Sequence, residues 1–365
     1  MTFPRLKTFL SVFPISDTSW GVRGGTDEHW RITLTDARAI HAFGALLPYL
    51  DGQTTTDDIL QALEGGGIQR GVAAAVLRQL ESASLLEERD AGGLSDAELS
   101  RFEDQIRFFS RFTQQGGARH QATLRDSRVA LIADDGLGES VYGRLANAGL
   151  GEVVIISRQR STVMRWIDRI ADPLPATTVH DLDLEVICPV DDTTRPRLLI
   201  VCQTAHDPQL LEAVDAWSKQ HGVAWLLIRS LELQEGWVGP LFVPGETASY
   251  LSLEARERTA MSRFREYLAF DAHVRATERP PAFGGLSAAF DLLASVAVIE
   301  VIKFVTEIKV PELLGKFLTI NPWTWDTELH EVLRVPALDR QGASRPSVFP
   351  WSAGIHANQT TTRDV

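Results

Sequence analysis

Two cysteines in 365 residues, Cys188 and Cys202, are too few for a disulfide framework or a cysteine-rich zinc site. Such scarcity is typical of a reducing compartment, so we expect a cytoplasmic protein. Positive charge is also in short supply, because the formal net charge is −12 and the isoelectric point is about 5.3. A chain of this charge repels the phosphates of nucleic acids, which are therefore not expected as main partners.

Long uncharged apolar runs are lacking as well. The most apolar segment, residues 286–305, carries Asp291, Glu300 and Lys303, which a membrane interior disfavours strongly. Near the N-terminus, Arg5 and Lys7 are not followed by the apolar stretch of a secretory signal. We therefore expect no membrane partner, and we interpret residues 286–305 as a buried helix of a soluble domain.

What is present is typical of a folded protein, with 44% hydrophobic and 23% charged residues, and the length suggests two or three domains. Residues 1–90 predict a small α+β domain in which three short strands precede three helices. Residues 29–34 alternate apolar and polar side chains, as a half-buried strand does. Residues 91–126 are expected to form a helical connector.

From residue 127 the pattern changes to strands that alternate with helices. Continuous apolar runs at 129–133, 153–156, 198–202 and 224–228 are typical of strands covered on both faces. Their alternation with helical patterns predicts a parallel sheet in an α/β domain over residues 127–336. The remaining residues, 337–365, are rich in Ser, Pro, Gln and Thr, and we expect them to form a flexible tail.

Four segments of the α/β region occur in the order found in ThiF/MoeB-like adenylating enzymes, which share the fold of ubiquitin-activating enzymes. They are Arg128 to Gly138, Leu145 to Val154, Val238 to Ala248, and Gly284 to Ala289. Residues 127–336 thus resemble this family, and the resemblance implies a Rossmann-type α/β fold. The third segment is the most specific match, because it resembles the one that leads into the zinc site of peptide-modifying members.

Residues 1–90 resemble a PqqD-like RiPP recognition element. This is a winged-helix-like module that binds the leaders of ribosomally synthesised, post-translationally modified peptides (RiPPs). The order of the two regions is similar to that of ThiF-like partner proteins of YcaO cyclodehydratases, which act in azole and thiopeptide biosynthesis. The resemblance implies a winged-helix-like module followed by a ThiF-like domain, with a precursor leader and a YcaO enzyme as partners.

The family's glycine-rich loop, Gly-x-Gly-Gly-x-Gly, is degenerate in this chain. Its positions hold Ala133, Asp134, Asp135, Gly136, Leu137 and Gly138. The first two glycines are replaced, and the aspartates direct negative charge toward a polyphosphate. Ser157 stands where an acid normally holds the ribose. The metal-binding aspartate is absent or displaced to Asp207. Arg165 is the candidate to replace the phosphate-binding lysine. We predict an inactive nucleotide pocket; a divergent, live ATP site is the alternative.

The zinc site of the family is also expected to be lost. Ser249 and Ser252 stand where members carry Cys-x-x-Cys, and residues 337–340 occupy the place of the second pair. We hypothesise that Trp323 and Trp325, placed on one face of a strand, pack this region without metal. No catalytic residue is predicted, since Cys202 fits a buried strand and no activated nucleophile is evident.

In the related modules, the third strand and third helix form the groove for the leader. Backbone pairing along residues 30–34 would supply affinity, and apolar leader side chains would enter between apolar helix positions. The predicted peptide-binding residues are Trp30, Arg31, Ile32, Thr33, Leu34, Arg70, Val72, Val76, Gln79 and Leu80. Arg31, Thr33, Arg70 and Gln79 are the candidates for specificity. For the apolar positions the alternative is the domain's own core.

Two functions follow from the resemblance. The first is a non-catalytic scaffold that binds a precursor leader and presents the peptide to a separate YcaO cyclodehydratase. The alternative is an ATP-dependent enzyme that adenylates a peptide carboxylate or amide. DNA binding by the winged-helix-like module is disfavoured, because residues 1–90 hold eight Lys or Arg against twelve Asp or Glu. A homodimer is expected only by analogy with other ThiF-like domains.

Overall fold

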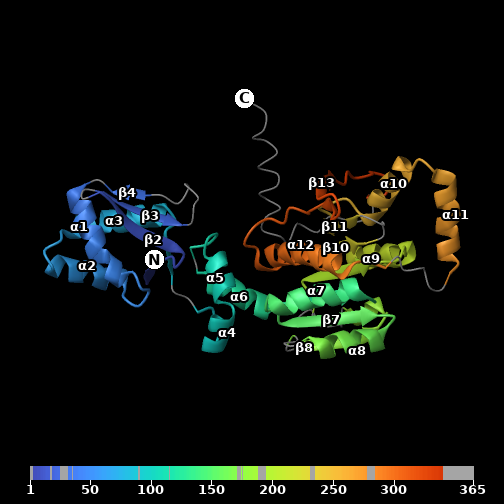
Figure 1. Cartoon of the computed structure of the whole chain (residues 1–365), viewed down its shortest axis with the longest axis horizontal. Coiled ribbons are helices and arrows are strands. Elements are labelled where there is room, and N and C mark those ends of the chain that lie inside the picture. The colour runs from blue at the N-terminus through green and yellow to red at the C-terminus, as the bar shows by residue number, and fades with distance from the viewer. Residues whose placement is uncertain are drawn as a thin grey trace, which may run out of the picture. The chain divides into compact units, whose positions relative to one another are not determined.

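The computed structural model describes residues 3–16, 19–24, 32–34, 36–88, 91–114, 116–170, 174, 176–187, 195–230, 235–277 and 284–339. The chain divides into two compact units, residues 1–123 and 124–365. Figure 1 shows the order of their elements along the chain. No helix among the described residues is long and apolar enough to span a bilayer.

The first unit contains two small antiparallel sheets and six helices among its described residues. One sheet has the order β2-β3-β4 and the other pairs β1 with β5. The strands are β1 (Pro4–Leu6), β2 (Leu10–Ser16), β3 (Ser19–Gly24), β4 (Ile32–Leu34) and β5 (Leu86–Glu88). The helices are α1 (Ala37–Leu46), α2 (Thr56–Gly65), α3 (Arg70–Ser82), α4 (Asp96–Arg101), α5 (Glu103–Phe109) and α6 (Gly117–Arg125), with a 3-10 turn, η2 (Leu47–Tyr49), after α1.

The predicted order of three strands and three helices is confirmed by β2 to β4 and α1 to α3. Helix starts are fixed locally: Asp36 accepts hydrogen bonds from the Arg38 and Ala39 amides, and Thr55 caps α2. The apolar faces of these helices pack on β3 and β4 around Phe43, Ile59 and other buried side chains. The β1–β5 pair was not predicted, because three-residue strands are too short to show a periodicity of two.

Residues 91–123 belong to the first unit. The Glu88 amide donates to the Gln114 carbonyl at 3.1 Å, and the Gln114 side-chain amide donates to the Ser84 hydroxyl at 3.2 Å. These hydrogen bonds join the segment after β5 to the end of α3. The unit boundary therefore lies at residue 123, whereas the folding of residues 1–90 as a domain of their own stays a prediction.

The second unit is built on an eight-stranded sheet of order β13-β12-β11-β10-β9-β6-β7-β8. Its strands are β6 (Arg128–Ile132), β7 (Glu152–Ser157), β8 (Ala176–Asp181), β9 (Leu198–Gln203), β10 (Ala224–Arg229), β11 (Gly236–Phe242), β12 (Lys316–Asn321) and β13 (Asp326–Glu331). Its helices are α7 (Gly136–Asn147), α8 (Arg160–Arg169), α9 (Pro208–His221), α10 (Tyr250–Ala260), α11 (Phe264–Arg275) and α12 (Ser287–Thr306), with a 3-10 turn, η3 (Leu184–Ile187).

Strands β8, β7, β6, β9 and β10 are parallel, and the pairs from β10 to β13 are antiparallel. Helices α7 and α12 cover one face of the sheet, and α9 and α10 cover the other. The strand order reverses between β6 and β9, so the loops after these strands diverge and leave room at the carboxyl edge. This position is where Rossmann-type folds hold their ligands. The α/β prediction is thus confirmed, including the apolar helix α12.

One strand prediction is wrong. The sequence placed Trp323 and Trp325 on one face of a single strand, but residues 322–325 form the turn between β12 and β13. Both indoles are exposed, Trp323 to 69% and Trp325 to 72%. The hypothesis that these two residues pack the region in place of zinc is therefore wrong as well.

Candidate functional site

The loops after β6, β7 and β9 enclose a cavity of about 220 Å³ at the carboxyl edge of the sheet. It occupies the position of the nucleotide in a Rossmann-type fold, at the point where the strand order reverses. Its lining residues are Ile132, Ala133, Asp134, Asp135, Arg158, Gln159, Cys202, Gln203, Thr204, Ala205, Asp207 and Leu210. Three of these are acidic and one, Arg158, is basic, so the lining is net negative.

Asp135 holds the N-terminus of α7, the place where a phosphate binds in the family. Its Oδ1 accepts the Leu137 amide at 3.1 Å, and its Oδ2 accepts the Thr204 hydroxyl. Burial raises the pKa of this carboxyl, and the hydrogen bonds from Thr204 and Leu137 only partly offset that effect. The helix terminus is thus capped by a carboxylate of the chain itself. The Leu137 amide, which could otherwise donate to a phosphate, is already used by Asp135.

The other two carboxylates of the cavity share Arg158. Its Nη2 lies 2.6 Å from Oδ2 of Asp207, and its Nη1 lies 3.8 Å from Oδ2 of Asp134. Asp134 also accepts the Ser157 hydroxyl at 2.7 Å, and Asp207 caps α9 by accepting the Leu210 amide at 3.0 Å. Arg158 is therefore already engaged by two carboxylates. These contacts do not fit a bound polyphosphate. Its negative charge would be repelled by three carboxylates, and the guanidinium of Arg158, which could attract it, is already paired.

Of the two glycines in the loop, Gly138 serves close packing in this structure. A Cβ on Gly138 would lie 2.2 Å from the Ala133 Cβ and 3.1 Å from the Trp166 ring. A Cβ on Gly136 would lie 3.4 Å from the Phe290 ring of α12. Gly138 therefore lets α7 pack closely on the end of β6 and on α8, whereas a Cβ at Gly136 would make only an ordinary van der Waals contact.

Arg165, the predicted substitute for the phosphate-binding lysine, does not line the cavity. It is exposed on α8 and donates to the Thr162 hydroxyl at 2.9 Å. The basic residue that the cavity does contain, Arg158, was missed. Its position directly after Ser157, at the carboxyl end of a predicted strand, was the signal available in the sequence.

The segments that would carry zinc are joined by hydrogen bonds. The Ser252 hydroxyl donates to Oδ2 of Asp339 at 2.8 Å, and the Ser249 amide donates to Oδ1 at 3.1 Å. Burial opposes ionisation of Asp339, but hydrogen bonds from Ser249 and Ser252 outweigh it and hold the pKa below its usual range. We call Ser249, Ser252 and Asp339 the Ser–Asp clasp. With no thiolate among them, these residues do not fit a zinc site.

An ion-pair network closes the carboxyl edge beyond β9 and β10. Arg229, at the end of β10, pairs with Glu257 of α10 at 2.7 Å and lies over the Trp237 ring at 5.5 Å from its centroid. His206, after β9, lies 3.4 Å from Asp271 of α11. Burial lowers the pKa of His206, although the hydrogen bond to Asp271 acts in the opposite direction. Helices α10 and α11 are thereby tied to the sheet edge by side chains of the chain itself.

Half of the predicted peptide-binding residues belong to the strand side of the groove. Trp30 and Arg31 lie outside the described residues. Ile32 and Thr33 lie in β4, opposite Val22 and Gly21 of β3, and β4 is an outer strand of its sheet. Leu34 is 4% exposed and belongs to the core, so its predicted contact with a leader is not supported. No strand among the described residues pairs with the second edge of β4, and that backbone edge is where an added strand could pair.

The helix side of the predicted groove needs a correction. Val76 and Leu80 are 2% and 1% exposed and pack in the core of the first unit, so the core alternative holds for them. Val72 is half-buried and Gln79 is exposed, and seven residues of spacing put both on one flank of α3. Arg70 is nine residues from Gln79, which is the opposite flank, and it pairs with Asp57 at 3.0 Å. Arg70 and Gln79 cannot line the same groove.

Comparison of the sequence with family profiles and with curated proteins found no match in either case. Comparison of the structure did find matches. Escherichia coli MccB solved with MccA aligns at 15% identity and a TM-score of 0.62, over 92% of this chain and 98% of that chain. MccB solved with ATP aligns with a TM-score of 0.60. A heterocyclase in complex with substrate and cofactor aligns at 18% identity and a TM-score of 0.62, over 91% of this chain and 38% of the heterocyclase.

These likenesses establish the fold. The second unit has a ThiF-like Rossmann-type α/β fold, and the first contains a small winged-helix-like α+β module. At 14–18% identity the likeness shows the architecture alone, so the chemistry of this chain has to be argued from its own residues.

Proposed function

We propose that this chain is a non-catalytic, leader-binding scaffold of RiPP biosynthesis. It binds the leader of a ribosomally synthesised precursor peptide and presents that peptide to a separate YcaO cyclodehydratase, which forms the azolines and azoles. Tethering the precursor raises its effective concentration at that enzyme. The chain itself uses neither ATP nor zinc.

The observation that carries the non-catalytic part is the capped N-terminus of α7. Asp135 takes the Leu137 amide, and Arg158 is held by Asp134 and Asp207. The phosphates of a nucleotide would have to displace the Asp135 carboxylate and would be repelled by Asp134 and Asp207. No free cation among the described lining residues compensates this repulsion. The cavity therefore suits a retained fold better than an adenylating site.

The leader-binding part rests on the outer strand β4 and on one flank of α3. An extended peptide can add to β4 through main-chain hydrogen bonds. On α3, the half-buried Val72 and the exposed Gln79 are the side chains that we propose for contacts with the leader. That MccB was solved in complex with MccA shows this architecture together with a second polypeptide, which favours the same kind of ligand here.

Leader binding should depend on the Val72 and Gln79 flank. We expect the double variant Val72→Ser, Gln79→Ala to bind the leader about tenfold more weakly, because an apolar contact of about 1.4 kcal/mol is removed. Fluorescence anisotropy of a fluorescein-labelled candidate leader peptide measures the change in Kd. The same variant should lose stimulation of cyclodehydration by the cognate YcaO enzyme.

The matched control is Arg70→Ala, on the opposite flank of the same helix, which should bind as the wild type does. A truncation for this assay should begin at residue 124, since residues 91–123 pack with the first unit. Equal leader affinity in residues 124–365 would place recognition outside the first unit. Absence of binding by the full chain, with the YcaO enzyme also present, would rule out the scaffold role.

The second candidate is an ATP-dependent enzyme that adenylates a peptide carboxylate or amide. The likeness to MccB over nearly the whole length of both chains, including a structure solved with ATP, favours it. The scaffold proposal predicts the opposite: titration calorimetry with ATP and Mg²⁺ should show no saturable binding below about 1 mM. Compared with a site of micromolar Kd, this is a binding free energy weaker by roughly 4 kcal/mol or more. Escherichia coli MccB is the positive control. Precursor-dependent ATP–pyrophosphate exchange by this chain would establish the enzyme instead.

A further inference from the structure

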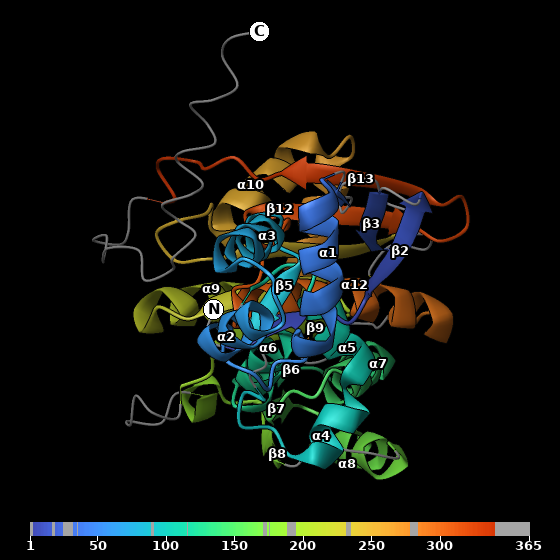
Figure 2. The same ribbon diagram turned by 90° about the vertical axis from the view of Figure 1, so that its left-hand side faces the viewer.

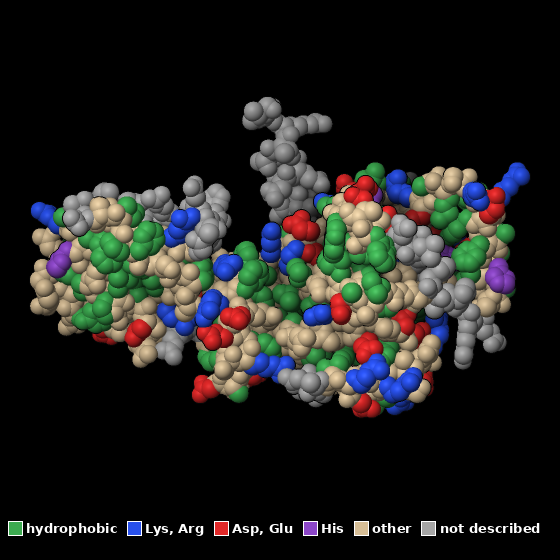
Figure 3. Space-filling model, viewed as in Figure 1, with side chains coloured by type: hydrophobic (Ala, Val, Ile, Leu, Met, Phe, Trp, Pro, Cys, Tyr) green, Lys and Arg blue, Asp and Glu red, His purple; other side chains and the backbone are tan. Residues whose placement is uncertain are grey.

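Helix α11 is an outer element of the second unit. It packs on α9, and Figure 2 shows α9 on the side of the sheet opposite to α12. Figure 1 places α11 at the end of this unit, beyond α9 and α10. Figure 3, drawn from the same direction, shows hydrophobic and basic side chains together at that end. The helix thus has one side against the unit and one side whose residues are exposed.

Contacts on its inner side hold α11 in one orientation. Asp271 Oδ1 lies 3.4 Å from the His206 Nε2 atom. Arg275 Nη2 lies 2.7 Å from Oε1 of Glu212 on α9. Val274 is 2% exposed and completes this side. The exposed residues of α11 are therefore ordered before a partner binds, which lowers the entropy that binding costs.

An apolar stripe runs along one exposed flank of the helix. Phe264, Leu268 and Ala272 recur at every fourth residue, a spacing that brings side chains to one flank. Phe264 is 45% exposed and Leu268 is 42% exposed, although both are large apolar side chains. Ala269 and Ala272, also exposed, are small enough for another backbone to come close. We call Phe264, Leu268 and Ala272 the α11 stripe.

Two arginines border the α11 stripe. Arg265 is three residues before Leu268, so their side chains are neighbours on the helix surface. Arg263 directly precedes the helix. Both arginines are exposed, and among the described residues neither has a carboxylate within 4 Å. The acidic residue Glu266 is two positions before Leu268 and therefore lies on the opposite flank. The stripe is thus apolar with a basic border.

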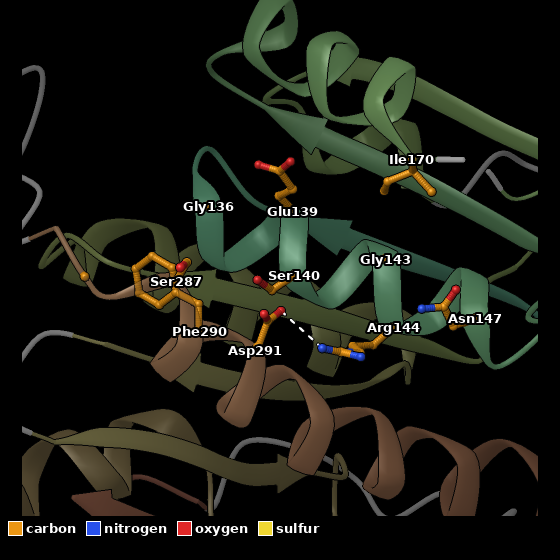
Figure 4. Close-up of a pocket in the computed structure, with 11 residues that line it drawn as sticks. Gly136, Glu139, Ser140, Gly143, Arg144, Asn147, Ile170, Ser287, Phe290 and Asp291 are labelled. Carbon is orange, nitrogen blue, oxygen red and sulfur yellow. Dashed lines mark ion pairs between the residues drawn. The ribbon is translucent and has the colours of Figure 1, made fainter. Parts of the chain in front are cut away.

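Other arginines of this unit have their charge compensated. Arg258 of α10 pairs with Glu254 at 2.8 Å, and Arg275 has the partner described above. On the other face of the sheet, a cavity of about 600 Å³ lies between α7 and α12. Figure 4 shows Arg144 and Asp291 of its lining pointing toward one another, with Nη2 3.5 Å from Oδ1. The two arginines beside the stripe, by contrast, carry positive charge that no carboxylate of the described chain neutralises, although the whole chain has a net charge of −12.

Charge and spacing determine which partner fits this flank. Side chains four residues apart form the ridge that packs into the groove of a second helix. Carboxylates on that helix would neutralise the two arginines, whereas the same flank of a second copy would bring like charges together. Anionic membranes attract larger clusters, of about four to eight basic residues. An acidic helix with an apolar stripe of its own is therefore the best match.

We infer that the α11 stripe is a docking site for an acidic amphipathic helix of a partner protein. Aliphatic side chains of that helix pack on Phe264 and Leu268, and its carboxylates pair with Arg263 and Arg265. This inference goes beyond the proposed function and does not depend on leader binding or on the nucleotide cavity.

The test uses the full chain and a fluorescein-labelled synthetic helical peptide, with leucines along one face and glutamates on the others. The peptide and the whole chain are both acidic, so binding requires a local site of opposite charge. We expect saturable binding by anisotropy that weakens at least tenfold in the double variant Phe264→Ala, Leu268→Ala, which keeps the net charge. Arg265→Gln should weaken binding and reduce its dependence on salt.

The matched controls are Arg160→Gln and Met164→Ala on α8. They remove an exposed arginine and an apolar side chain that is 43% exposed, and both variants should bind as the wild type does. An unchanged thermal unfolding midpoint in the double variant shows that any loss of binding is not a loss of folding. Arg265→Gln tests the site independently of that variant.

Four results would each overturn the inference. The first is no saturable binding by the wild type, and the second is equal affinity in the wild type and the double variant. The third is equal affinity for a peptide of the same composition whose leucines are scattered over all faces. The fourth is a homodimer, seen by light scattering, that the double variant converts to monomer, because a second copy would then cover the stripe.

Discussion

Replacing Gly138 with alanine is expected to lower the stability of the second unit by about 3 kcal/mol or to unfold it. The new Cβ would lie 2.2 Å from the Ala133 Cβ and 3.1 Å from the Trp166 ring. Ala133 and Trp166 are both buried, so neither can move aside without displacing β6 or α8. Urea denaturation of the full chain, followed by far-UV circular dichroism, measures the change in the free energy of unfolding.

Gly143→Ala, on the same helix, is the control for this substitution. Its Cβ would meet only the Ile170 Cδ1 atom, at 3.8 Å, so it should be neutral or stabilising by about 0.5–1 kcal/mol through helix propensity. The comparison also bears on function. If Gly138→Ala folds as stably as the wild type, close packing is not the reason for the glycine, and a role in approaching a phosphate regains support.

Asp339→Ala is expected to destabilise the second unit by about 2–3 kcal/mol at pH 7. The substitution removes charge-assisted hydrogen bonds from the Ser252 hydroxyl and the Ser249 amide, and leaves these donors without their acceptor. For a unit of this size the unfolding midpoint should fall by roughly 4–12 °C. Differential scanning calorimetry measures it. Added zinc should not restore the midpoint, because the segment carries no thiolate.

The effect should depend on pH with a defined sign. Because the pKa of Asp339 is lower in the folded chain than in the unfolded one, its contribution is complete above the ordinary aspartate range and disappears as pH falls through the folded value. The stability difference between wild type and Asp339→Ala should therefore shrink from pH 7 towards pH 3. Glu312→Ala, at an exposed ion pair with Lys309 3.8 Å long, should cost less than about 0.5 kcal/mol. A difference that stays constant with pH would show that the Ser–Asp clasp does not act through its charge.

Local pattern was enough for the parallel strands and most of the helices. Runs such as 129–133 and 198–202 are apolar throughout, as strands covered on both faces are, and they form β6 and β9. The aspartates before α7 and the serines at positions 249 and 252 can likewise be read directly from the sequence. The sequence also predicts that Arg70 and Gln79 lie on opposite flanks of one helix. They are nine residues apart, which corresponds to two and a half helical turns at about 3.6 residues per turn.

Tertiary structure decided which charges meet. Arg158 reaches Asp134 and Asp207 because β6, β7 and β9 end at one edge, although these residues are 24 and 49 positions away in the chain. Asp339 meets Ser249 across 90 residues, because the segment after β13 returns to the start of α10. The sequence by itself determined most strands and helices and the residue types at 133–138 and 249–252, because these depend on single positions and their neighbours. Only the fold decided which of these side chains meet, since hydrogen bonds and ion pairs form between side chains that the topology brings within about 3 Å.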